Sequence, residues 1–219
     1  MTITIEERII TGIKDGVNRH WSYTQVLLNI KPEYLLTISV ADSLVHGFNN
    51  IPALQLEIKL EEKTHSICGH LLIHMLLDRK MRSQALHIAK NSIHRKGKVD
   101  IYVIHEPNSW IVELKGFNPS WEQIKKELIR LCQFLSIEST VNKIVGCYIA
   151  FPTLENKESW LKNKLNSLSS INGFNINLKT EPIETNEDPE DGIPVYFVNC
   201  ISITLTPQST NTVTDEIIE

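Results

Sequence analysis

The stretch that most constrains the fold spans residues 97–131 and predicts two short strands, a tight connection and a helix. The predicted strands, Val99–Ile104 and Trp110–Lys115, are rich in β-branched and aromatic residues. Residues 105–108 between them include Pro107, which cannot donate a backbone hydrogen bond and is typical of turns. The stretch therefore predicts an antiparallel hairpin followed by a helix.

The register of this hairpin predicts a cluster of ionisable side chains. If residues 105–108 form the loop, Ile104 faces Ser109, and Asp100 then lies opposite Glu113. Alternation along the strand places Lys115 on the same face as Glu113. Burying two carboxylates and an amine without a partner or a metal is costly, so the cluster predicts a functional site.

The chemistry that suits this cluster is phosphodiester hydrolysis. Two acids on adjacent strands can share a hard divalent cation such as Mg²⁺ through oxygen ligands. The cation lowers the pKa of a bound water and neutralises charge on the phosphate. Lys115 beside it would orient the attacking water and stabilise the developing negative charge.

Asp100 followed by Glu113-Leu114-Lys115 resembles the D…(D/E)xK signature of the PD-(D/E)xK (restriction-endonuclease-like) nucleases, although no proline precedes Asp100. The resemblance implies an α/β fold with an αβββαβ core, in which helices flank a mixed central sheet. It also implies that Asp100, Glu113 and Lys115 are catalytic, and that Asp100 and Glu113 bind Mg²⁺, for which Mn²⁺ can substitute. The alternative is an ordinary hairpin whose charged face is solvated.

The first core helix of such nucleases often supplies a further acidic ligand. Lys31-Pro32-Glu33 opens a predicted helix, which makes Glu33 the candidate. Acids are favoured in a first helical turn in any case, so a structural reason for Glu33 stays open. The alternatives are Asp42, Glu61 and Glu62. A second pairing, Asp42 with Glu57-Ile58-Lys59, is disfavoured because Asp42 lies in a helical pattern.

A basic segment precedes Asp100 and predicts contact with the DNA backbone. Residues 78–98 hold seven Lys and Arg against a single acid, Asp78. The candidate phosphate contacts are Arg95, Lys96 and Lys98, with Gln123 and Lys126 on the helix after the hairpin. A solvated helix face is the alternative.

Periodicity predicts the other elements. A half-buried strand is expected over 53–62, with its apolar residues, Leu60 among them, facing the core. The apolar run Lys143–Phe151 predicts an interior strand parallel to the second hairpin strand. A helix capped by Ser120 should turn Ile124, Leu128, Leu131 and Leu135 to the sheet, and Lys125, Lys126 and Arg130 away from it. Further expected elements are a helix over Glu158–Leu168 and strands over Phe174–Leu178 and Val195–Leu205.

A histidine-rich segment contains side chains of the types that bind zinc. His65, Cys68, His70 and His74 include an i, i+4 histidine pair. The segment lacks the glutamate of an HExxH hydrolase and has no second cysteine pair nearby. Structural histidines in a buried helix or apolar strand are therefore expected.

Composition and length set the domain organisation. We expect an N-terminal helical extension over 1–31, with a helix over 5–17 and Ser22 opening another, then a nuclease-like domain over 32–206. Its core would be 32–151, with 152–206 adding a helix and strands and 207–219 forming a disordered polar tail. A net charge of −4 requires any DNA-binding surface to be local.

Four scattered cysteines predict reduced thiols, and the absence of a signal-like or long apolar run predicts a cytoplasmic protein without a membrane partner. The predicted function is that of a Mg²⁺-dependent DNA endonuclease of restriction, phage defence or mobile-element biology. The alternative is an inactive nuclease-fold module that binds nucleic acid or a protein. A homodimer, or a partner subunit of a multi-component system, is a further expectation.

Overall fold

A computed structural model describes residues 4–24, 33–47, 56–91, 97–137, 142–168, 173–184 and 196–206. Six strands form one sheet in the order β1-β2-β3-β4-β6-β5. Strands β3 and β4 run parallel and the other neighbours antiparallel, so the sheet is mixed. The strands are β1 Glu57–Lys63, β2 Lys98–His105, β3 Asn108–Leu114, β4 Lys143–Thr153, β5 Phe174–Ile183 and β6 Tyr196–Leu205.

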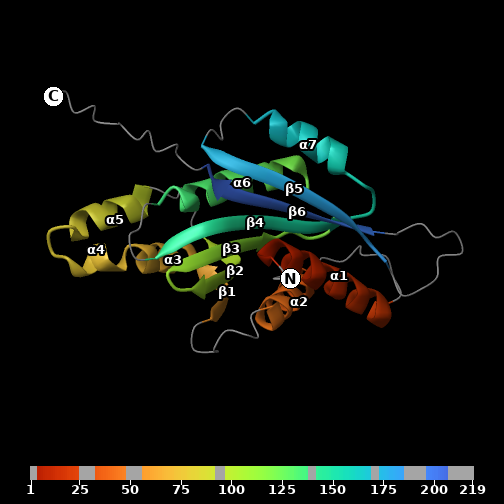
Figure 1. Cartoon of the computed structure of the whole chain (residues 1–219), viewed down its shortest axis with the longest axis horizontal. Helices are drawn as coiled ribbons and strands as arrows, with labels where there is room; N and C mark the ends of the chain where they lie inside the picture. The colour runs from red at the N-terminus through yellow and green to blue at the C-terminus, as the bar shows by residue number, and fades with distance from the viewer. Residues whose placement is uncertain are drawn as a thin grey trace, which may run out of the picture.

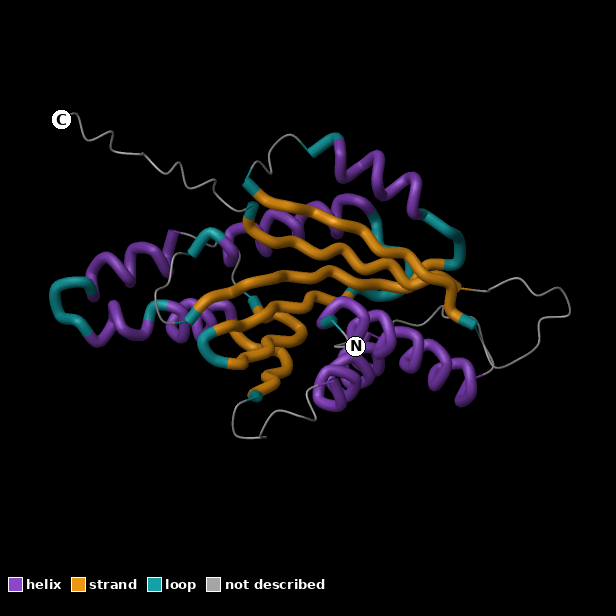
Figure 2. The backbone as a smooth tube through the Cα atoms, viewed as in Figure 1, coloured by secondary structure: helices purple, strands orange, loops and turns teal. Residues whose placement is uncertain are grey.

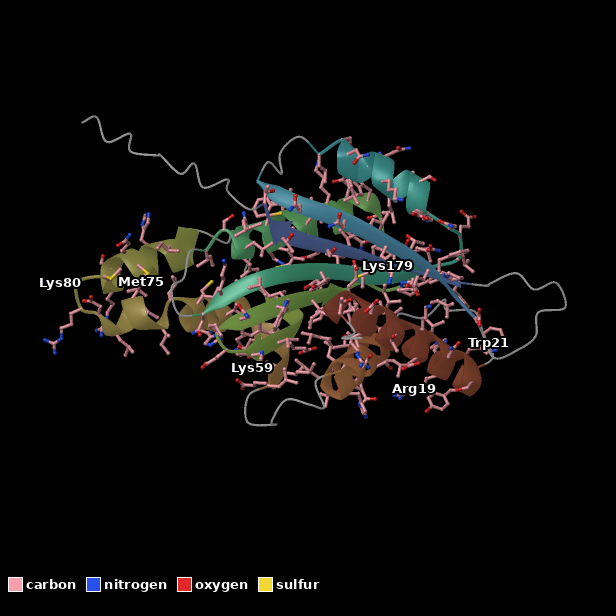
Figure 3. All side chains as sticks on the ribbon, viewed as in Figure 1. Arg19, Trp21, Lys59, Met75, Lys80 and Lys179 are labelled. Atoms are coloured by element: carbon pink, nitrogen blue, oxygen red, sulfur yellow. The ribbon has the colours of Figure 1, made fainter. Side chains whose placement is uncertain are left out.

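Helices cover both faces of this sheet (Figure 1). Helices α1 (Ile5–Thr24) and α2 (Glu33–Gly47) lie on one face, and α6 (Trp121–Leu135) and α7 (Glu158–Asn166) lie on the other. Three short helices connect β1 to β2 and extend from one end of the sheet, with Lys80 at their far tip (Figures 1 and 3). These are α3 Thr64–Leu71, α4 Ile73–Leu77 and α5 Arg82–Asn91.

Each face of the sheet has its own apolar core, because successive side chains of the interior strands alternate between faces. Ile111 of β3 packs in the core beneath α6, whereas the next residue, Val112, packs in the core beneath α1 and α2. Figure 2 shows the resulting helix–sheet–helix layering. The α/β class and the mixed sheet flanked by helices, predicted from the sequence, are confirmed.

The predicted hairpin register is confirmed, but its loop is shorter than predicted. Ile104 pairs with Ser109, as expected. His105 also pairs with Asn108, so only Glu106 and Pro107 form the turn. A two-residue loop keeps the same register as the predicted four-residue loop because both ends of the loop move by one residue.

Helix α1 is longer than predicted and belongs to the core. Its first turn has a reciprocal cap, in which Glu7 N–H donates to Thr4 Oγ1 and Thr4 N–H donates to Glu7 Oε2 (3.2 and 2.7 Å). The helix continues to Thr24, so Ser22 does not open a new helix. Ile9 and Ile13 are fully buried against the sheet, so this part of the segment 1–31 packs directly on the rest of the chain.

Helix α2 and strand β1 follow the predicted order with one difference. Leu36, Val40 and Leu44 of α2 are fully buried at helical spacing. Leu60 was predicted to face the core but is 38% exposed. Because β1 is an edge strand, alternation alone does not bury its apolar positions.

The elements after the hairpin lie close to their predicted positions. Strand β4 runs parallel to β3 in the sheet interior, as predicted. Strand β5 extends to Ile183 instead of ending at Leu178, and β6 inserts between β4 and β5. The tail predicted over 207–219 lies outside the described residues. Across the described ranges, no helix is both long enough and apolar enough to cross a bilayer.

Helices α1 and α2 pack backbone against backbone. A Cβ atom added to Gly12 would lie 2.5 Å from Val40 Cα, which no real Cβ tolerates without a shift of the backbone. In contrast, a Cβ added to Gly69, in helix α3, would meet nothing within 4 Å. Gly12 is therefore required by packing and Gly69 is not.

We expect Gly12→Ala to lower the free energy of unfolding by about 1–3 kcal/mol, because the methyl group forces α1 away from α2. Gly69→Ala, the matched control, should raise it by up to about 1 kcal/mol through helix propensity. Urea unfolding followed by circular dichroism measures both. Equal effects of the two substitutions would contradict the close α1–α2 contact.

Candidate active site

The predicted site residues lie where β2 and β3 meet the start of the connection to α6. The pairing of β2 with β3 ends at Ile101 and Val112, and the same register sets Asp100 opposite Glu113. Beyond that pair, the Leu114 N–H donates to Asp100 Oδ2 at 2.6 Å. The Asp100 carboxylate thus replaces a strand carbonyl as the acceptor, which fixes it against β3.

The Glu113 carboxylate is buried and has a cation on each oxygen. Its side chain is 6% exposed. Lys115 Nζ donates to Glu113 Oε1 at 2.7 Å, and Arg130 Nη2 donates to Glu113 Oε2. The predicted alternation is confirmed, because Lys115 reaches Glu113 on the face of the sheet covered by α6, opposite Val112 and Leu114.

Helix α6 adds two charged residues that complete a closed arrangement. Arg130 Nε lies 2.8 Å from Glu127 Oε2, and Lys115 Nζ lies 3.5 Å from Glu127 Oε1. We call Glu113, Lys115, Glu127 and Arg130 the charge ring, in which acid and base alternate and the formal charges cancel. All four side chains are 15% exposed or less.

The position of Arg130 corrects the sequence-based prediction. Arg130 was expected to point away from the sheet with Lys125 and Lys126, but its side chain is 2% exposed. Its Nη1 donates to the Lys98 carbonyl at 2.8 Å, so it links α6 to the start of β2. A buried carboxylate and a backbone carbonyl accept hydrogen bonds from its two terminal nitrogens, so these groups have partners within the protein.

Glu127 was also missed, although the sequence carried a signal for it. It lies three residues after Ile124 and four before Leu131, which are both fully buried. This spacing places Glu127 on the apolar face of α6. A carboxylate inside an apolar stripe predicts a buried partner, here Arg130 and Lys115.

Two pKa shifts describe the electrostatics of the site. Burial, then the negative charge of Glu113, raises the pKa of Asp100 from 3.8 to about 7, against the opposing Leu114 hydrogen bond. Burial alone would lower the pKa of Lys115, but the charges of Glu113, Glu127 and Asp100 raise it above its ordinary value. Lys115 is therefore a cation near neutral pH, and Asp100 changes its charge there.

Glu33 is an acid of α2 whose negative charge acts on this site. It is the first residue of α2, and its negative charge also raises the pKa of Asp100. The alternatives have other neighbours: Asp42 lies 3.8 Å from Arg19, and Glu61 pairs with Lys98 at 2.6 Å. Glu62 Oε1 accepts from the Lys63 N–H at 3.1 Å.

The predicted nucleic-acid contacts do not form one group with the charge ring. Lys98 has an exposed side chain paired with Glu61, and Lys126 is exposed on α6. The Gln123 side chain serves the helix cap, where its Oε1 accepts from the Ser120 N–H at 2.8 Å. Arg95 and Lys96 lie outside the described residues.

The histidine-rich segment forms α3 and α4. His70 Nδ1 lies 2.7 Å from the Tyr102 hydroxyl, and burial raises the pKa of the Cys68 thiol to about 11. His65 is exposed, and the side chain of His74 lies outside the described part of the chain. All four cysteines are free and buried. Among described residues, no three His, Cys, Asp or Glu side chains are grouped to hold a metal ion.

The carboxylates near Asp100 fit a divalent cation on one condition. Burial and then the negative charge of Glu113 raise the pKa of Asp100, and a cation held by both carboxylates would relieve their repulsion. Both Glu113 oxygens already contact a protein cation. The two carboxylates of Asp100 and Glu113 would therefore fit Mg²⁺ only if Glu113 exchanged one of its ion-pair partners for the metal.

No family model matches the chain, and no curated protein or solved structure matches it.

We expect Asp100→Asn to change the pH dependence of stability. Because the folded-state pKa of Asp100 is raised, its carboxyl ionises in the unfolded chain first, and wild-type stability falls as pH rises from about 4 to 7. Asparagine does not ionise, so the variant should gain up to about 4 kcal/mol relative to wild type across this window.

Urea unfolding of both proteins at pH 4, 5, 6, 7 and 8 measures this difference in the free energy of unfolding. Contributions from groups that titrate alike in the two proteins cancel in the difference. A stability difference that stays constant with pH would contradict the raised pKa of Asp100.

Proposed function

We propose that this chain is a Mg²⁺-dependent endonuclease that hydrolyses DNA phosphodiester bonds. The observation that carries the proposal is the convergence of Asp100, Glu113 and a cationic Lys115 at the end of one hairpin. Two acids and a lysine in this arrangement suit hydrolysis of an anionic ester, because they combine a cation site with a fixed positive charge.

The order of elements supports a PD-(D/E)xK-like core. Helix α2, strands β1, β2 and β3, helix α6 and strand β4 follow one another in the order αβββαβ, with α3 to α5 inserted between β1 and β2. Strand β4 is parallel to β3, as a crossover through α6 requires. The site would then lie at the carboxyl end of β3, with Glu33 of α2 on one side and α6 on the other.

The chain's own residues have distinct roles in this proposal. Asp100, Glu113 and Glu33 would hold the Mg²⁺ ion, which when bound supplies a water of lowered pKa and neutralises phosphate charge. Asp100 is kept in place by the Leu114 N–H. Lys115, held by Glu113 and Glu127, would stabilise negative charge on the phosphate.

The DNA would approach along the basic segment that leads into β2. Arg95, Lys96 and Lys98 precede Asp100, and Lys126 and Gln123 are further candidates on α6. This activity suits the cleavage of foreign or mobile DNA in the cytoplasm. The protein would act as a homodimer or with a partner subunit.

A second candidate function is a nuclease-fold protein that binds nucleic acid or a protein without cleaving. The observation that favours it is the charge ring itself, which satisfies both Glu113 oxygens with protein cations and needs no metal to do so. Cleavage assays separate the two candidates.

We expect the wild-type protein to nick plasmid DNA with Mg²⁺ or Mn²⁺ and to lose this activity in EDTA. Asp100→Asn and Glu113→Gln should abolish nicking because each removes a charged oxygen ligand. Lys115→Ala should lower the rate about 100-fold or more while Mn²⁺ binding persists.

Glu158→Gln and Lys162→Ala are the matched controls, because these residues form an exposed ion pair of 2.6 Å on α7. They should nick at the wild-type rate. Metal-independent nicking, or full activity of Lys115→Ala, would refute the proposed function.

Neutralising the basic segment should weaken DNA binding. Replacing Arg95, Lys96 and Lys98 together by alanine removes three positive charges, so the slope of log K against log salt should fall by about 3. Gel shifts in EDTA at several salt concentrations measure the slope. The same triple replacement of Lys157, Lys162 and Lys164 near α7 is the control, and equal losses in both variants would place the DNA elsewhere.

A further inference from the structure

The charge ring contains two carboxylates, but only one of them belongs to the proposed metal site. Glu113 lies on β3 beside Asp100, whereas Glu127 lies on α6. Both carboxylates contact the same two cations: Lys115 is 2.7 Å from Glu113 and 3.5 Å from Glu127, and Arg130 contacts both acids. The two acids therefore share one pair of cations.

Stability alone does not account for a ring buried this deeply. Removing four charges from water costs free energy that their mutual attraction recovers only in part, and well-packed apolar residues are often as stable. Asp100 is an additional acid beside the ring, where it accepts the Leu114 N–H and lies within the electrostatic influence of both Glu113 and Lys115. Exchange of ion-pair partners at Glu113 explains the arrangement of the charge ring better than stability does.

We infer that Arg130 and Glu127 are positioning residues that set how tightly Glu113 binds a divalent cation. Arg130 competes with the metal for the Glu113 carboxylate. Glu127 favours the metal, because it already contacts Arg130 and Lys115 and keeps both cations paired when Glu113 turns to the metal. This inference rests on the proposed function and deepens it.

The inference gives the two residues opposite effects on metal affinity, which a merely structural role does not. Removing Arg130 removes a competing positive charge and makes the site more negative. Removing the charge of Glu127 commits Arg130 and Lys115 to Glu113 and makes the site more positive. If the ring only supported the fold, damage to either residue would weaken metal binding or leave it unchanged.

Isothermal titration of metal-free protein with Mn²⁺ tests this. We expect Arg130→Gln to tighten Mn²⁺ binding and Glu127→Gln to weaken it, each by about tenfold or more, because each substitution removes one unit charge from the ring that contains Glu113. Lys162→Gln and Glu158→Gln remove the same charges from the exposed pair on α7 and should leave the affinity unchanged.

Arg130→Gln leaves two buried acids short of a partner and can fail to fold, so the wild-type protein supplies a second measurement. The side-chain Nε signal of Arg130 in a ¹⁵N NMR spectrum, assigned by its loss in Arg130→Lys, should shift as Mg²⁺ is added, because Arg130 leaves Glu113. A signal that does not move at saturating Mg²⁺ overturns the inference.

The outcomes separate this inference from the proposed function. Wild-type protein that binds no Mn²⁺ and cleaves no DNA refutes both. Wild-type protein that binds Mn²⁺ and cleaves DNA, while the two ring variants shift affinity in the same direction or not at all, refutes only the role of Arg130 and Glu127.

Discussion

The contact between the Arg130 guanidinium and the Glu113 carboxylate holds three elements together at the site. Through it α6 is joined to β3, and the same guanidinium reaches the Lys98 carbonyl at the start of β2. Both side chains are almost fully buried, so neither can turn to water if the other is lost. Breaking such a pair typically costs about 3–5 kcal/mol, because it leaves a buried charge without a partner. The positions of Glu113 and of the start of β2 therefore depend on a residue of the facing helix.

The balance of charge decides what the site can do. Within the ring the acids and bases cancel, and Asp100 is then an additional acid in a region already shielded from water. Burial, and after it the negative charge of Glu113, raises its pKa to about 7 although Lys115 lies nearby. A site with one acid more than its bases attracts a cation, and a site with every oxygen already occupied resists one. Both tendencies meet at Glu113, and under the proposed function a metal ion would bind only when Glu113 gives up one of its protein cations.

The sequence predicted the local geometry of the hairpin but not the residues that complete it. Period-two alternation fixed the faces of Val112, Glu113 and Lys115, since a slip of one residue would exchange the two faces. The helical pattern predicted that Arg130 faces solvent, because cations on helices usually do. Its contacts with the Lys98 carbonyl and the Glu113 carboxylate, which join residues distant in sequence, overturn that prediction. Leu60 shows the opposite error, because alternation predicts a face without predicting that the strand lies at a sheet edge. The order β4-β6-β5 is set by contacts distant in sequence, which a local pattern does not contain.

The rotation of α6 about its own axis links its cap to the site. Ser120 and Gln123 close the first turn through reciprocal hydrogen bonds, and Ile124, Leu128 and Leu131 then fix which face meets the sheet. Glu127 and Arg130 reach β3 only because this rotation is fixed, since a shift of one residue turns a helix by about 100°. Gln123 was predicted to contact phosphate, yet its side chain accepts the Ser120 N–H and completes the cap. Gln123 therefore supports the site by holding the phase of α6, and a direct contact with phosphate would require its side chain to give up the Ser120 N–H.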